Sequence, residues 1–139
     1  MKKRIYFILT LSVIAFVSRS QTVQKQSEEP IITPTMENPL QSQVYFIGGP
    51  EAYAKFLRTN IHYPSLAVKD KIEGRAIIKF VVEKDGSLSN FKLEKDPGGG
   101  LGEEAVRVLK LSPKWSPGKL KDKFVRVQTW VFVPFELPN

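Results

Sequence analysis

The residue types that most often carry out catalysis are scarce in this 139-residue chain. It contains one histidine, His62, and no cysteine. General acid–base and nucleophilic catalysis need such a group beside a nucleophile or an orienting carboxylate, and the sequence does not place one beside His62. A single histidine without cysteine also excludes the common zinc sites. We therefore interpret His62 as a partly exposed spacer and expect no enzymatic activity, no metal and no other cofactor.

The glycine-rich and acidic segments fit structural roles better than chemical ones. The run that starts at Gly98 has Glu103 where a dinucleotide-binding fingerprint requires its last glycine. Gly118-Lys119 is not followed by serine or threonine, so it is not a phosphate-binding P-loop. Glu103 and Glu104 would point about 100° apart on a helix, which is a poor arrangement for paired catalytic carboxylates. They suit the N-terminal end of a helix instead.

The two tryptophans carry more information than the charged residues. Trp115 lies in a proline-rich loop, and we expect it to fill the core under the second helix because large aromatic side chains are mainly buried. Trp130 lies on the same face of the last strand as Arg126 and Gln128. Its pattern is equally compatible with the core and with a binding surface.

The last strand is the best candidate binding element on physical grounds. Residues 124–137 alternate between apolar and polar over an unusual length, and Pro134 keeps the end out of the middle of a sheet. At a sheet edge, this strand would expose unpaired N–H and C=O groups with which an extended peptide could pair. Central pairing, or pairing with itself in a homodimer, are the alternatives. The candidate peptide-binding residues on it are Phe124, Arg126, Gln128, Trp130 and Phe132.

The elements that would position this strand follow from periodicity. Helical spacing predicts helices over residues 50–60 and 103–111, with one further turn at 66–68. Alternation predicts strands over 75–83 and 88–94, joined by a tight turn at Asp85-Gly86. Residues 112–123 are expected to be irregular, and an edge strand is expected at 44–46. The order predicts a two-layer α+β domain over residues 43–139, with a three-stranded antiparallel sheet and two helices.

The N-terminus is a separate unit. Three basic residues at positions 2–4 precede an apolar run over residues 5–17, and small residues follow, which is typical of a signal peptide. The run reaches roughly 20 Å as a helix, less than the hydrocarbon core of a bilayer, which favours cleavage over an uncleaved membrane anchor. We interpret residues 1–20 as a signal peptide, with an uncleaved anchor as the alternative. We accordingly expect a periplasmic protein or, as the alternative, one that is anchored in the inner membrane and faces the periplasm.

Between the N-terminal unit and the domain lies a linker, and the chain without residues 1–20 carries only a modest net charge. Residues 21–42 are rich in Gln, Glu, Pro, Thr and Ser, and such a composition predicts a flexible segment. Residues 1–20 contain four basic and no acidic residues, so their removal lowers the formal net charge from +7 to +3. No basic stripe with interleaved aromatic residues remains, so we expect no nucleic-acid partner.

The ordered motifs of the domain resemble a known family. They begin with Phe46-x-Gly48-Gly49 and Tyr63-Pro64, continue through Asp85-Gly86, and end with Pro113-x-Trp115-x-Pro117-Gly118-Lys119 and Val131-x-Val133-Pro134-Phe135. This set, spread over about residues 44–137, resembles the TonB C-terminal domain as found in Bacteroidetes-type energy transducers. The set as a whole is specific, although no single motif is.

The resemblance implies a fold, a partner and a site. It implies two helices on a three-stranded antiparallel sheet, and a role in energy-coupled transport across the outer membrane. The implied partners are TonB-dependent outer-membrane receptors, whose TonB-box peptide adds to the last strand, and the ExbB–ExbD motor if the chain is anchored. Tyr63 and Pro64 lie near that contact in the family, so they join the candidate residues. A stand-alone periplasmic adaptor that binds peptides or envelope proteins without the motor is the alternative.

Overall fold

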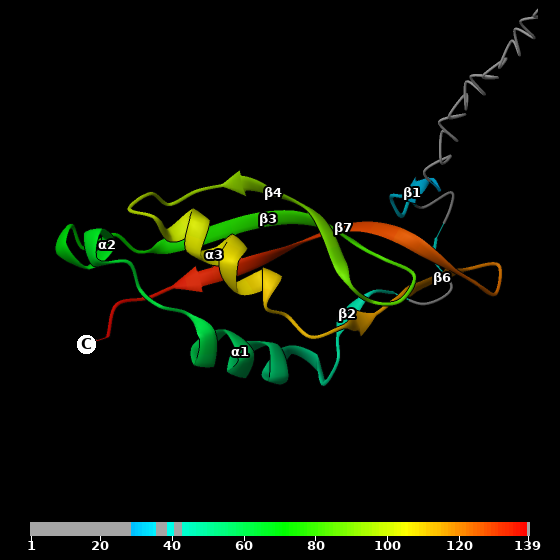
Figure 1. Cartoon of the computed structure of the whole chain (residues 1–139), viewed down its shortest axis with the longest axis horizontal. Helices are drawn as coiled ribbons and strands as arrows, with labels where there is room; N and C mark the ends of the chain where they lie inside the picture. The colour runs from blue at the N-terminus through cyan, green and yellow to red at the C-terminus, as the bar shows by residue number, and fades with distance from the viewer. Residues whose placement is uncertain (1–28, 36–38, 41–42, 139) are drawn as a thin grey trace, which may run out of the picture.

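A β-hairpin forms one side of the main sheet (Figure 1). The structure, a computed structural model, describes residues 29–35, 39–40 and 43–138. β3 (Gly74–Val82) and β4 (Leu88–Lys95) run antiparallel on either side of a tight turn. Gly86 in this turn has a φ of 85°, and a Cβ there would lie 2.2 Å from the carbonyl oxygen of Trp115, so the turn requires glycine. The predicted hairpin is confirmed.

The long strand β7 (Lys123–Phe135) lies on the other side of β3. The two strands pair antiparallel in continuous register, from Val127 opposite Val82 to Phe135 opposite Gly74. Val127, Val133 and Phe135 are buried on the face that meets the helices, whereas Trp130 and Phe132 are exposed. The alternation in the sequence therefore assigned the side chains of β7 correctly to its two faces. The predicted α+β class is also confirmed.

The main sheet contains more strands than the three predicted. β6 (Gly118–Leu120) pairs antiparallel with the start of β7, and β1 (Ile31–Ile32) pairs with β7 in parallel, which makes five strands. Lys121 and Asp122 form the turn between β6 and β7 with φ values of 48° and 62°. The prediction of an irregular segment over residues 112–123 missed this hairpin.

β1 falls within the segment predicted to be a flexible linker, and for its two residues that prediction needs correction. Pairing with an existing strand supplies backbone hydrogen bonds that amino-acid composition does not reveal. The rest of that segment is described only in part, since residues 21–28, 36–38 and 41–42 lie outside the described residues, as does the predicted signal peptide over residues 1–20.

A second, two-stranded sheet lies beside the main one. β2 (Tyr45–Phe46) pairs antiparallel with β5 (Trp115–Ser116), with Phe46 opposite Trp115. The predicted strand at residues 44–46 therefore exists, but it is not an edge of the main sheet. β5, like β6, was not predicted, because a two-residue strand shows no periodicity.

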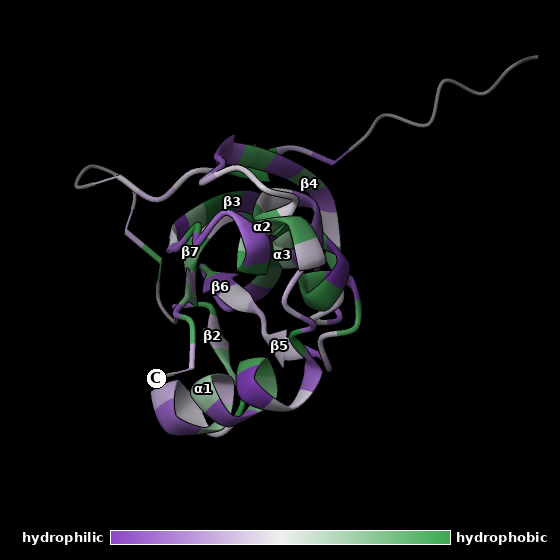
Figure 2. Cartoon of the chain, turned by 90° about the vertical axis from the view of Figure 1, so that its left-hand side faces the viewer, coloured by the Kyte–Doolittle hydropathy of each residue, from purple (hydrophilic) through white to green (hydrophobic). Residues whose placement is uncertain are grey.

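Three helices complete the domain. α1 (Gly49–Asn60) has Pro50 and Glu51 in its first turn, where proline and negative charge are both favourable. α2 (Ser65–Lys69) is the predicted single turn, and α3 (Leu101–Lys110) packs on β3 and β4. Figure 2 shows α3 under the sheet and α1 farther from it.

The core lies between the sheet and these helices, and Trp115 is at its centre. Its side chain is 5% exposed, as expected of a core residue. Its ring lies 5.7 Å from that of Phe46 and 5.2 Å from that of Phe80, both edge to face, and 6.1 Å from that of Tyr53 in α1. Trp115 therefore joins α1 to the sheet, rather than filling space only under the second long helix.

Candidate functional site

The side of β7 that faces away from β3 differs along the strand. β6 pairs with β7 from Lys123 to Val125, and β1 pairs with Arg126 and Val127 on this outer side. From Gln128 to Phe135, no strand of the described part of the chain pairs with it. We call the first stretch the covered half and the second the open half. Peptide binding was predicted from the sequence if the last strand lay at an exposed sheet edge. The open half meets this condition.

Two observations show which backbone groups of the open half point outward. The hydroxyl of Tyr53 in α1 donates to the carbonyl oxygen of Phe132 at 3.1 Å, so this carbonyl faces away from β3. Pro134, which has no N–H to donate, stands two residues further on and so faces the same side. Because backbone groups alternate sides along a strand, Gln128 and Trp130 also present N–H and C=O groups outward. An extended chain laid along this edge would meet ready donors and acceptors.

The side chains of the open half form an exposed aromatic pair. Trp130 is 53% exposed and Phe132 is 42% exposed, with ring centroids 5.0 Å apart at an interplanar angle of 76°. The guanidinium carbon of Arg75 on β3 lies 5.9 Å from the centroid of the Phe132 ring. Two adjacent exposed aromatic residues with a cation beside them are typical of binding surfaces, in which aromatic residues and arginine are enriched.

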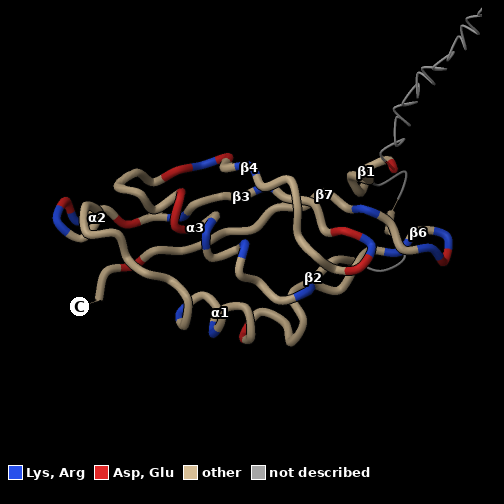
Figure 3. The backbone as a smooth tube through the Cα atoms, viewed as in Figure 1, with Lys and Arg blue, Asp and Glu red and all other residues tan. Residues whose placement is uncertain are grey.

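The open half carries no charge of its own. No charged residue stands between Val127 and Phe135. Figure 3 shows Lys, Arg, Asp and Glu gathered instead at the β6–β7 turn, along β4 and around α2. The strand itself would therefore hold a ligand by main-chain hydrogen bonds and apolar contacts.

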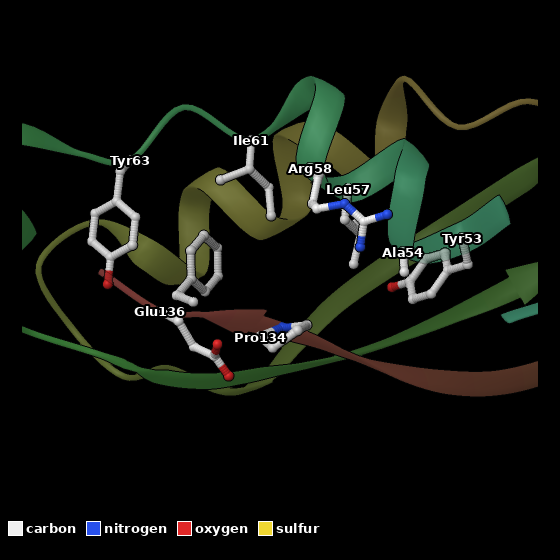
Figure 4. Close-up of a pocket in the computed structure, with 9 residues that line it drawn as sticks. Tyr53, Ala54, Leu57, Arg58, Ile61, Tyr63, Pro134 and Glu136 are labelled. Atoms are coloured by element: carbon white, nitrogen blue, oxygen red, sulfur yellow. The ribbon is translucent and has the colours of Figure 1, made fainter. Parts of the chain in front are cut away.

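A groove runs between α1 and the end of β7. It has a volume of about 460 Å³. Figure 4 shows Tyr53 and Tyr63 at its two ends, with Pro134 and Glu136 across from α1. Burial raises the pKa of the Tyr53 hydroxyl, so this group stays protonated and remains a donor to β7. The lining residues are Tyr53, Ala54, Leu57, Arg58, Ile61, Tyr63, Pro134, Phe135 and Glu136.

Tyr63 and Pro64, the two candidates outside the last strand, separate in the structure. Tyr63 lines the groove, donates its hydroxyl to the carbonyl oxygen of Ile72 at 2.6 Å, and packs edge to face on Phe135 at 5.9 Å. Burial, and then the Glu73 carboxylate, raise the pKa of the Tyr63 hydroxyl. Pro64 precedes α2 and does not line the groove, so only Tyr63 lies beside the end of β7.

The five candidates on β7 also divide between its two halves. Gln128, Trp130 and Phe132 lie in the open half, whereas Phe124 and Arg126 lie in the covered half. Phe124 pairs with Lys119 of β6, whose ammonium group lies 4.8 Å from the ring centroid. Arg126 donates to the Glu83 carboxylate at 2.8 and 3.1 Å and to the carbonyl oxygen of Glu29 at 2.9 Å. These two side chains are thus engaged within the chain.

Sequence reasoning missed the part of the site that α1 contributes. Tyr53, Phe56, Leu57 and Ile61 fall at helical spacing, and this spacing predicted the helix. The same spacing fits a helix that only packs on a core, so it could not show that one side of the helix borders a groove. The hydrogen bond from Tyr53 to β7 joins residues 79 positions apart and has no local signal.

The residues considered for catalysis have structural contacts. The side chain of His62 is exposed, and its backbone N–H donates to Glu104 at 2.6 Å. The Arg107 guanidinium, and then this backbone N–H, hold the pKa of the Glu104 carboxyl below its usual range. In the described ranges, no group of three or more His, Cys, Asp or Glu side chains is placed to hold a metal ion. Those ranges also contain no helix that is long and apolar enough to cross a membrane.

Among the similar solved structures are two NMR solution structures of the Helicobacter pylori TonB C-terminal domain. The one of residues 179–285 is 21% identical and covers 66% of this chain and 89% of its own, with a TM-score of 0.39. The one of residues 194–285 is 18% identical and covers 63% and 95%, with the same TM-score. No curated protein sequence matched the chain.

The comparison with family models assigns the chain to a family, because the match covers more than half of its length. The model of the Gram-negative bacterial TonB protein C-terminal domain matches residues 59–137. Domains of this family are periplasmic interaction domains rather than enzymes, associate with outer-membrane receptors, and are linked to TonB-dependent transport across the envelope. Because the match spans more than half of the sequence, and includes α3 and all of β3, β4 and β7, the chain belongs to the family of TonB C-terminal domains.

Proposed function

We propose that this domain binds the TonB-box peptide of an outer-membrane receptor as an added strand along β7. The open half supplies outward N–H and C=O groups at Gln128 and Trp130, and side chains of the peptide would alternate between two surfaces. One surface is the aromatic pair Trp130 and Phe132. The other is the groove that Tyr53 and Tyr63 line.

The observation that carries this proposal is the outer side of β7 from Gln128 onward, with which no strand within the described ranges pairs. β7 is hydrogen-bonded to β3 from Val127 to Phe135, so its open half is rigidly held. An edge of this kind is a template for another chain. Its exposed aromatic residues would add specificity to main-chain pairing, which by itself is tolerant of sequence.

The place of binding follows from the predicted signal peptide. We propose that residues 1–20 export the chain, so that the domain meets receptor segments in the periplasm. If these residues stay attached as an anchor, contact with an ExbB–ExbD motor follows; if they are cleaved, the domain acts as an adaptor. Sequencing the N-terminus of protein from membrane and periplasmic fractions tells these apart, because cleavage gives a mature start near Gln21.

Two substitutions of the same residue test strand addition. Trp130→Pro removes both the indole and the outward N–H, whereas Trp130→Ala removes only the indole. A short synthetic peptide that carries a receptor TonB box should bind the wild-type chain in a calorimetric titration. We expect Trp130→Ala to weaken this binding several-fold and Trp130→Pro to abolish it, since proline cannot donate to an added strand.

The controls separate loss of the edge from loss of the fold. Trp130 is exposed and its outward N–H does not serve the β3 ladder, so both variants should keep the far-ultraviolet circular dichroism of the wild type. Equal binding by Trp130→Ala and Trp130→Pro would show that the peptide binds without joining the sheet. Concentration-dependent self-association that the peptide does not suppress would instead identify a second copy of the chain as the occupant.

A further inference from the structure

A short segment of the chain itself already sits on the edge of β7. β1 runs parallel to β7, with Ile31 opposite Arg126 and Ile32 opposite Val127. The Arg126 guanidinium donates to the carbonyl oxygen of Glu29 at 2.9 Å, and the Glu29 carboxylate forms an ion pair with Lys84. Backbone pairing and two polar contacts therefore hold the segment on the covered half.

The sequence limits β1 to a weak attachment. Pro30 precedes the two paired residues, and Pro34 follows them after a single threonine. Because proline has no N–H, it cannot extend a ladder, and the pairing ends at Ile32. Ile31 also remains 37% exposed. A two-residue strand between prolines forms few hydrogen bonds, each with a modest net contribution, so it can be displaced.

The open half is short for the strand that it is proposed to accept. Its outward positions are Gln128, Trp130, Phe132 and Pro134, but Tyr53 already occupies the carbonyl oxygen of Phe132, and Pro134 has no N–H. Strands in proteins usually contain about five or six residues. An incoming strand of that length gains further outward groups only by extending past Gln128 to Arg126, where β1 lies.

Displacement of β1 would leave β7 intact. The Arg126 side chain keeps its two hydrogen bonds to Glu83, at 2.8 and 3.1 Å, when Glu29 departs. The pairing of Val127 with Val82 on β3 is also independent of β1. The edge under β1 is thus preformed, and exchange of one strand for another needs no rearrangement of the sheet.

We propose that β1 is an internal competitor for the peptide site, so that a bound peptide replaces Ile31–Ile32 on β7. This inference rests on the proposed function, since it assumes that the peptide adds to β7. The apparent affinity is then the intrinsic affinity reduced by the fraction of molecules in which β1 is detached. Residues 29–32 would thereby restrict binding to peptides that pair well enough to displace them.

Two variants of the full chain should change peptide affinity in opposite directions. Ile31→Pro combined with Ile32→Pro removes both N–H groups of β1 and frees the edge. Pro34→Thr supplies an N–H where the pairing now stops, and so allows β1 to extend along the open half. With the receptor peptide as probe, we expect the double variant to bind roughly 3–10-fold more tightly and Pro34→Thr to bind more weakly. Val23→Pro combined with Gln24→Pro places the same two prolines ahead of β1 and should leave the dissociation constant unchanged.

A second probe distinguishes this inference from the proposed function. A synthetic peptide with the sequence of residues 29–35 should bind the Ile31→Pro, Ile32→Pro variant more tightly than the wild type, whose edge is occupied. If receptor peptides bind all variants equally, β1 does not compete and the inference is wrong. If no receptor peptide binds any variant but the peptide of residues 29–35 binds the double variant, the proposed function fails while β1 stands as the occupant of the edge.

Discussion

The two halves of β7 belong to one strand but have different surroundings. Both are continuous with a sheet in which β3 pairs with residues 127–135. The covered half meets β6 and, on its outer side, β1, and it carries a network in which Arg126 binds Glu83 and Glu29. The open half has no charge between residues 127 and 135, and α1 borders its end across a groove.

The difference between the two halves shows how the domain limits the length of its exposed β7 edge. Proteins normally blunt sheet edges, because unpaired backbone groups recruit other chains. Here β1 pairs with the start of the edge at Arg126 and Val127, and Pro134 and the hydroxyl of Tyr53 block its end. What remains is a short stretch at Gln128–Phe132. The binding surface is therefore defined by the stretch of β7 that the chain leaves unpaired within its described residues, more than by any particular side chain.

The largest expected effect is at the residue that holds α1 against the sheet. Trp115→Ala removes a buried ring that contacts Phe46, Tyr53 and Phe80. We expect a loss of about 3–5 kcal/mol in the free energy of unfolding, typical of a large aromatic residue truncated in a core. Urea denaturation measures this loss. Trp115→Phe should retain much of the stability, and equal losses in both variants would contradict a packing role.

Proline substitution at neighbouring residues of the open half tests whether their N–H groups face opposite sides of β7, one toward β3 and the next outward. Val131 pairs with Ile78, and by alternation its N–H serves the β3 ladder. Val131→Pro should therefore cost about 1–3 kcal/mol or more, because a buried carbonyl on β3 loses its donor. Trp130→Pro, whose missing N–H faces outward, should cost much less in the same urea titration. Equal losses would mean that the outer groups are not available to a partner.

Much of the fold was predictable, because its long elements have local signals. Alternation and the Asp85-Gly86 turn predicted the β3–β4 hairpin, and alternation also predicted β7. The short strands were not predictable in this way. β1, β5 and β6 are each two or three residues long, and they exist because a neighbouring backbone supplies their hydrogen bonds. The β6–β7 turn uses Lys121-Asp122 without glycine, so its signal was weak.

The candidate site was predictable along β7 but not across from it. Alternation placed Trp130 and Phe132 on one face, and both are exposed there. Which end of the strand would be covered depends on β1 and β6, whose positions are set by tertiary pairing. The groove depends on the contact of Tyr53 with Phe132, far apart in sequence. A pattern in one segment cannot encode the relation between two segments, so these features needed the structure.

The ion pair that supports the covered half should make its stability depend on pH. Hydrogen bonds from Arg126, and secondarily from Ser89, hold the pKa of the Glu83 carboxyl below its unfolded value of about 4.3. A carboxyl of this kind stabilises the fold above its unfolded pKa, and that contribution is lost as the pH falls through the folded pKa. Glu83→Gln should cost about 1–2 kcal/mol at neutral pH and progressively less below about pH 4.

A second carboxylate provides the control for this pH dependence. Glu94 on β4 forms ion pairs with Lys79 and Lys92 at 3.2 and 3.3 Å, but it is exposed and these ion pairs do not involve Arg126. Glu94→Gln should therefore change unfolding little at any pH, since exposed ion pairs contribute little. Unfolding curves that lose the same stability in both variants, or a Glu83→Gln penalty that grows in acid, would reject a specific role for the Arg126–Glu83 pair.

Two phenylalanines give the mildest test of the comparison between the halves. Phe124 in the covered half is 48% exposed, and Phe132 in the open half is 42% exposed. Because both are surface residues of one strand, each alanine variant should change the free energy of unfolding by no more than about 1 kcal/mol. Receptor-peptide binding should separate them: Phe132→Ala loses an aromatic contact and weakens binding, whereas Phe124→Ala, whose backbone stays paired with β6, leaves it unchanged. Calorimetric titration of the two variants side by side checks this, and weaker binding by Phe124→Ala alone would assign the peptide to the covered half.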